Sequence, residues 1–127
     1  GTISGAKVTS TKLTFVPSTG TLSSTVMVAT SDERTKTDWE PLQEDFVTKL
    51  AGVKYGTFRR LESKVREVGV GAQSLESLLP EAVVEGVDGF KAVNYGGASL
   101  AAVIELAKEV VKLRAELEAL KYPKTGA

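Results

Sequence analysis

The stretch that decides the fold is residues 100–121, which read LAAVIELAKEVVKLRAELEALK. Six of the larger apolar residues recur at alternating spacings of three and four, which is the heptad pattern of a coiled coil. The spacing therefore predicts a long C-terminal helix over about residues 98–121. Its a and d positions, which we call the seam, are all Val or Leu: Val103, Leu106, Val110, Leu113, Leu117 and Leu120.

The charges beside the seam indicate how copies of this helix would pair. Glu109 and Glu116 fall at g positions, and Arg114 and Lys121 fall at e positions. In a parallel, in-register pair, each g residue meets the e residue five positions on in the neighbouring chain, so both contacts join opposite charges. This favours parallel self-assembly over an amphipathic helix lying on its own domain, which would carry a wider apolar stripe.

The heptads alone leave two strands and three strands both open. Val at a with Leu at d leans towards dimers. Leu117 at an a position weakens that preference.

The composition of the whole chain excludes several classes of function. With 127 residues and a mass of 13.5 kDa, one domain with a short appendage is expected. The formal net charge is zero, so nothing favours nucleic acid or an anionic membrane as a partner. The chain has no apolar run of membrane-spanning length and no signal-peptide pattern. Without Cys and His, thiolate and imidazole chemistry is excluded. Oxygen-only binding of Mg²⁺ or Ca²⁺ stays possible, but the sequence has no EF-hand spacing and no Gly-rich phosphate loop with a Lys, and we expect neither a metal nor a cofactor.

The first thirty residues differ in composition from the rest. They carry only Lys7 and Lys12 as charges and are rich in Ser and Thr, which suggests a boundary near residue 30. Two β-branched runs, residues 12–16 and 24–28, flank a turn signal at 17–20 and predict a hairpin. Such a hairpin is marginal alone and needs another surface. The alternative is a frayed Ser/Thr linker.

The segment that follows mixes helical and strand patterns. Together with the C-terminal helix it predicts an α+β fold: a short N-terminal β segment, a small mixed domain, and a long helix forming a parallel coiled coil. The Asp88-Gly89 pair is a strong hairpin signal. The expected elements are helices at 38–50 and 73–79, the latter stopped by Pro80, and strands at 53–58, 64–70, 82–84 and 90–93.

The boundary itself reads SDERTK over residues 31–36. From the residues alone, the favoured interpretation is that Ser31 is a helix N-cap followed by acids in the first turn. Lys36 is then an ordinary solvated charge.

Four ordered motifs nevertheless resemble a known family, the self-cleaving C-terminal intramolecular chaperone domain of phage tailspikes, tail fibres and endosialidases. The first motif is SDERTK itself. The others are VGVGAQ at 68–73, LPEAVV at 79–84 and DGFKAVNY at 88–95, followed by the long helix. The resemblance covers residues 31 to about 121.

The resemblance implies a homotrimeric chaperone, residues 31–127, that registers an upstream β-structured fibre and then cuts itself off. Residues 1–30 would be the end of that fibre. The cut would fall between Thr30 and Ser31, with Ser31 and Lys36 as a catalytic Ser-Lys dyad, so the chain would act once on itself as a serine endopeptidase. It also implies production in the bacterial host cytoplasm, with the fibre going to the virion tail and the chaperone released.

The chemistry of such a dyad requires a neutral amine. Burial disfavours an ammonium ion, so a lysine desolvated by trimer formation can accept the proton of a serine hydroxyl. Arg34 or backbone N–H groups are candidates for stabilising the oxyanion, and Asp32 and Glu33 for orienting Lys36 or, preferably, capping the next turn. Whether the dyad acts within one chain or between chains stays open, as does whether the chain is cleaved or a precursor.

Two other functions compete with this one. A structural trimerisation module would share the fold but leave the bond before Ser31 intact. A receptor-binding fibre tip would use residues 1–30 and the loops to bind a host surface.

Overall fold

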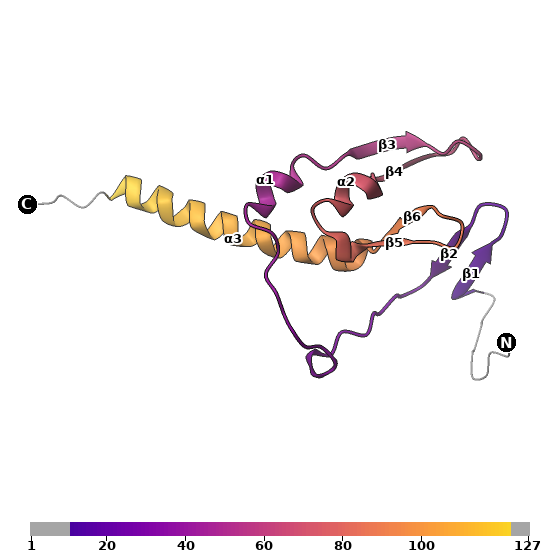
Figure 1. Ribbon diagram of the computed structural model, residues 1–127, viewed down its shortest axis with the longest axis horizontal. Coiled ribbons are helices and arrows are strands. Elements are labelled where there is room, and N and C mark those ends of the chain that lie inside the picture. Colours follow the sequence, from indigo (N-terminus) through magenta and orange to yellow (C-terminus); the bar gives the residue numbers. More distant parts are fainter. Residues whose placement is uncertain (1–10, 123–127) are drawn as a thin grey trace, which may run out of the picture. The chain divides into compact units, whose positions relative to one another are not determined.

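A computed structural model describes residues 11–122 (Figure 1). The chain divides into two compact units, Gly1–Glu40 and Pro41–Ala127. The predicted boundary at residue 30 is a different kind of division, between fibre residues and chaperone residues. It stays a prediction.

The first unit contains a two-stranded antiparallel hairpin of β1 (Leu13–Val16) and β2 (Thr21–Ser24). Its loop closes tightly, because the Gly20 N–H donates to the Val16 carbonyl at 2.8 Å and Gly20 takes a φ of 72°. This turn fixes the register, so pairing starts at Val16 and Thr21. The predicted second strand at 24–28 is therefore wrong, since β2 ends at Ser24.

The second unit begins with a shorter helix than predicted. Residues 38–50 do not form one helix: α1 spans only Phe46–Leu50. Asp38 and Asp45 both have positive φ values, 56° and 58°, and such residues interrupt a right-handed helix. Pro41 consequently lies outside the helix.

The middle of the unit follows the predicted alternation more closely. The hairpin around Asp88-Gly89 forms as predicted, with Gly89 at a φ of 83° and the Asp88 carboxylate accepting the Phe90 N–H at 2.9 Å. Both sheets of this unit are isolated antiparallel pairs. The elements are β3 (Tyr55–Arg59), β4 (Arg66–Val70), α2 (Ala72–Glu76), the 3₁₀ turn η2 (Pro80–Ala82), β5 (Val83–Glu85) and β6 (Lys91–Val93).

The core of the unit is small. Apolar residues from α1, α2 and η2 meet there, and the start of the C-terminal helix packs against them through Ala98 and Ala102. A core of this size stabilises a fold only modestly and leaves much apolar surface uncovered. The buried members are Phe46, Val53, Leu75, Leu78, Leu79 and Ala82.

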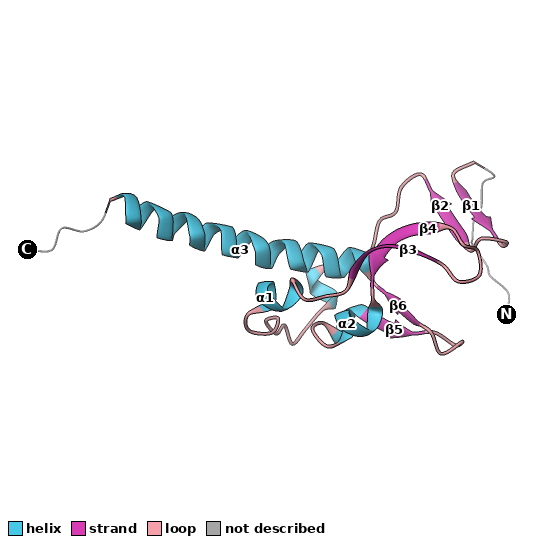
Figure 2. Cartoon of the chain, turned by 90° about the horizontal axis from the view of Figure 1, so that it is seen from above, coloured by secondary structure: helices cyan, strands magenta, loops and turns pink. Residues whose placement is uncertain are grey.

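The C-terminal helix α3 spans Tyr95–Lys121. It begins three residues before the predicted start, because the Asn94 side chain caps it by accepting the Gly97 N–H at 3.2 Å. The second half of α3 extends past α1 with no other element of its unit beside it (Figures 1 and 2). All six seam residues are exposed, between 43% and 78%, so the seam is not the face on which α3 packs against its own unit.

Gly69 allows a close approach between β4 and α3. The Tyr95 hydroxyl accepts the Val70 N–H at 3.1 Å, and a Cβ at Gly69 would lie 2.6 Å from that oxygen. We expect Gly69→Ala to lower the free energy of unfolding by about 1–3 kcal/mol, the usual cost of overpacking. In chemical denaturation, Gly69→Ala combined with Tyr95→Phe should be more stable than Gly69→Ala alone. Additive losses would contradict this explanation.

Candidate functional site

The bond between Thr30 and Ser31 lies in an exposed, irregular part of the first unit. Residues 26–32 form neither helix nor strand, and every side chain in this stretch is exposed. The apolar side chains there are uncovered, with Val28 87% exposed. This backbone is open to attack, because it is neither paired in a sheet nor covered by its own unit.

A single turn directly follows that bond. The 3₁₀ helix η1 (Glu33–Thr35) is capped by Asp32, whose carboxylate accepts the Arg34 N–H at 2.9 Å. The Thr35 hydroxyl also donates to the Asp32 carbonyl at 2.7 Å. The cap is therefore Asp32, and the interpretation of Ser31 as the N-cap is wrong. The turn reverses the chain over five residues.

This reversal brings Ser31 and Lys36 together. The Lys36 Nζ donates to the Ser31 Oγ at 2.6 Å. Both residues are exposed in the single chain. The two residues that the sequence resemblance pairs as a dyad are thus in direct contact, and the hydroxyl belongs to the residue on the C-terminal side of the Thr30–Ser31 bond.

The three supporting candidates have separate roles in the turn. The Arg34 guanidinium donates two hydrogen bonds to the Asp32 carboxylate, from Nε at 3.1 Å and from Nη2 at 2.9 Å. This pairing lowers the pKa of Asp32 below its usual value and raises the pKa of Arg34. Glu33 contributes its backbone carbonyl, which accepts the Lys36 N–H at 3.0 Å. All three residues take part in the turn. The positive charge of Lys36 also contributes to lowering the pKa of Asp32.

One neighbour of the site was not predicted. The Lys36 Nζ lies 5.5 Å from the centroid of the Trp39 ring, within cation–π range. The Trp39 side chain is 71% exposed in the single chain. The Lys-x-x-Trp spacing was the available signal, but on its own it is too common to indicate a contact.

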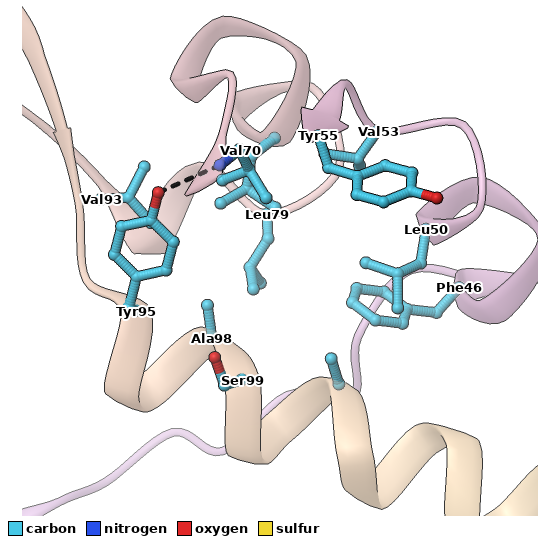
Figure 3. A pocket seen from close by; sticks show the side chains of 12 residues that line it. Phe46, Leu50, Val53, Tyr55, Val70, Leu79, Val93, Tyr95, Ala98 and Ser99 are labelled. Atoms are coloured by element: carbon cyan, nitrogen blue, oxygen red, sulfur yellow. Dashed lines mark hydrogen bonds between the residues drawn. The ribbon is translucent and has the colours of Figure 1, made fainter. Parts of the chain in front are cut away.

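A second feature of the chain is an apolar pocket inside the second unit (Figure 3). It has a volume of about 290 Å³ and lies between α1, the paired ends of β3 and β4, and the first turns of α3. Among the residues that line it, none is charged. The Tyr95 hydroxyl and the Val70 N–H hydrogen-bond to each other at its edge. The pocket therefore suits an apolar occupant.

The described part of the chain contains neither a candidate metal cluster nor a helix that could span a membrane. Within residues 11–122, no group of three acidic side chains converges in a way that could hold a metal ion. Of the helices described, none is both long enough and apolar enough to span a bilayer.

Comparison with known proteins identifies the segment that contains the site. Residues 31–84 match the family Peptidase_S74, chaperone of endosialidase. The family predicted from the sequence is thereby confirmed for this segment. The match starts at Ser31 and ends at Val84, so it covers the Ser31–Lys36 turn and most of the core, but not α3. No curated protein matches the chain.

The chaperone of endosialidase match supports an intramolecular chaperone role in a phage tail context. Its family name also indicates a peptidase-type domain. The first residue of the family match is Ser31, the same serine whose hydroxyl accepts the hydrogen bond from Lys36.

The Asp32 cap offers a test of how the turn positions the site. For the self-cleavage that the family resemblance implies, we expect Asp32→Ala to slow the reaction several-fold, because the turn that brings Lys36 to Ser31 loses its cap. Asp32→Asn keeps an oxygen for the Arg34 N–H and should slow cleavage less. The time course of fragment formation measures both, and equal effects would show that the cap does not position the dyad.

Proposed function

We propose that residues 31–127 are a self-releasing chaperone for an upstream phage tail fibre or tailspike. The segment assembles as a parallel homotrimer, holds three copies of the fibre in register, and then cuts the bond between Thr30 and Ser31. In this proposal residues 1–30 are the end of the fibre and stay with the virion tail, and the chaperone, made in the host cytoplasm, is released. The observation that carries it is the 2.6 Å contact between Lys36 Nζ and Ser31 Oγ.

The reaction starts with a proton transfer. Lys36, as a neutral amine, takes the proton of the Ser31 hydroxyl, and Oγ bonds to the carbonyl carbon of Thr30. The bond between that carbon and the Ser31 nitrogen then breaks, and Nζ passes its proton to the departing nitrogen. The product of this step is an ester between Thr30 and the Ser31 side chain.

Water completes the reaction. It adds to the ester carbonyl, the ester bond breaks, and Oγ recovers a proton. Thr30 then ends in a carboxylate and Ser31 in a free amine. No cofactor is required, because the serine supplies the nucleophile and the lysine shuttles the proton.

Assembly controls the reaction through the state of Lys36. In the single chain this side chain is exposed, and the ammonium form is well solvated. Burial of the turn within a trimer would remove that solvation and favour the neutral amine. The cut therefore waits until three chains have come together.

Mass spectrometry of freshly made, denatured wild-type protein tests the proposal. The expected result is two fragments that meet between Thr30 and Ser31. A single intact mass from an assembled sample would contradict self-cleavage and would leave a structural trimerisation module as the function. Fragments that meet at any other bond would exclude Ser31 as the nucleophile.

A further inference from the structure

A second apolar stripe runs along α3 beside the seam. It consists of Leu100, Ile104, Ala107 and Val111, which occupy e and b positions of the heptads, and we call it the b/e stripe. Leu100, Ile104 and Val111 are 64%, 50% and 63% exposed. The next e and b positions hold Arg114 and Glu118, so the stripe is confined to the first half of α3.

The compact unit of the same chain cannot cover this stripe. α3 packs on its own core through Ala98 and Ala102, which are c and g positions. The c/g flank and the b/e flank lie on opposite sides of the seam around the helix. The stripe therefore needs a partner other than its own unit.

The charge pattern of α3 indicates a second copy as that partner. Glu109 at g is complementary to Arg114 at e of a parallel neighbour, as Glu116 is to Lys121. In that arrangement the g flank of each helix faces the e flank of the next. Because the compact unit sits on the c/g flank, it faces the b/e stripe of the neighbouring copy.

The apolar pocket lies at the height that this arrangement requires. Its α3 wall is formed by Ala98, Ser99 and Ala102. In parallel, in-register helices, residues of equal number stand at equal height, so Leu100 and Ile104 of the neighbour arrive level with the pocket. An apolar pocket of about 290 Å³ has room for bulky aliphatic side chains.

We infer that Leu100 and Ile104 of one copy occupy the pocket of the next copy. Val111 extends the same contact further along α3. The contact joins two different surfaces, so it can repeat around a symmetry axis and close into a ring. The inference rests on the parallel assembly of the proposed function and adds a second interface to the seam.

Site-specific photo-cross-linking tests the inference in the full chain. A photoreactive p-benzoylphenylalanine replaces Ile104, and chains of natural isotope content are assembled with ¹⁵N-labelled chains. The expected product is a heavy–light cross-link from position 104 to residues 41–93, the compact unit of the other copy. The same probe at Leu113, in the seam, should join α3 to α3 between copies. At Lys108, an exposed f position, it should give no product between copies.

The outcomes separate the interface from the assembly. If position 113 cross-links between copies and position 104 reaches only α3, its own chain or nothing, the pocket contact is wrong and the assembly stands. If neither position cross-links between copies, the assembly itself fails, and the inference fails with it.

Thermal unfolding of the assembled protein gives an independent measurement. Ile104→Glu should lower the midpoint of unfolding, because a carboxylate would enter an apolar pocket. Ala115→Glu, on an exposed f position of the same helix, should leave it unchanged. Equal midpoints for the two variants would overturn the inference.

Discussion

A Ser31→Ala variant is expected to give a single intact chain, whereas the proposed function predicts two fragments from the wild type. In the proposed mechanism, this substitution removes the hydroxyl that attacks the Thr30 carbonyl. Loss of the nucleophile costs at least about a thousandfold in enzymes that use one. Denaturing mass spectrometry after prolonged incubation measures the loss.

Two further variants separate the chemical role of this site from its structural role. Ser24→Ala, at the end of β2 in the same unit, should cleave at the wild-type rate. Lys36→Arg keeps a cation beside Ser31 but cannot act as a base near neutral pH, and should slow cleavage by about 10²–10⁴-fold. Wild-type cleavage by Lys36→Arg would show that charge, and not proton transfer, is what this position supplies.

A Leu113→Asp variant is expected to lose both assembly and cleavage, although Ser31 and Lys36 are untouched. Leu113 is a central d residue, 53% exposed in the single chain, so the substitution costs little before assembly. In the assembled seam it would place a carboxylate in each copy away from water, and such burial costs several kcal/mol. A penalty of about 3 kcal/mol corresponds to a loss of more than about a hundredfold in assembled protein.

Light scattering and the fragment time course report the two losses together. Ala115→Asp, at an exposed f position two residues further on, should retain both assembly and cleavage. Normal cleavage by a monomeric Leu113→Asp chain would show that the dyad acts without assembly and would remove the proposed control of Lys36.

The pH range over which the η1 turn persists depends on the pKa of Asp32. Arg34 lowers that pKa, so the contribution of the carboxylate to the turn is present above its ordinary value of 3.8 and is lost as the pH falls through the lowered value. We expect the η1 turn to persist at pH 4, as seen from the chemical shift of the Arg34 amide proton. Melting of the turn between pH 7 and pH 5 would contradict this.

The long helix could be predicted because its evidence is periodic and local. Heptads predicted the extent of α3, and the only error was at its start, whereas the seam that they define stays a prediction. Gly96 and Gly97 favour a break, yet the Asn94 cap carries the helix through them. Short elements depended on backbone features that periodicity does not encode. The positive φ values at Asp38 and Asp45 shortened α1, and the tight turn at Gly20 moved β2.

For the candidate site, the residues alone were less informative than they were for α3. Residue types alone predict that Ser31 is a cap and Lys36 a solvated charge. Only the family resemblance paired them, because residues five apart in an exposed stretch have no fixed separation without the intervening turn. The sequence contained the Asp32 cap, but its carboxylate and the Ser31 hydroxyl were both plausible acceptors. The structure assigns the cap to Asp32, which leaves the Ser31 hydroxyl in contact with Lys36.

The position of α3 in the chain has a consequence for timing during synthesis. α3 follows Ser31 by more than sixty residues, so the ribosome completes the bond between Thr30 and Ser31 well before it completes α3. Under the proposed mechanism, a nascent or truncated polypeptide lacking α3 keeps its two segments joined. Cleavage would then occur only in chains whose translation has continued through α3. Incomplete products would keep their chaperone segment attached.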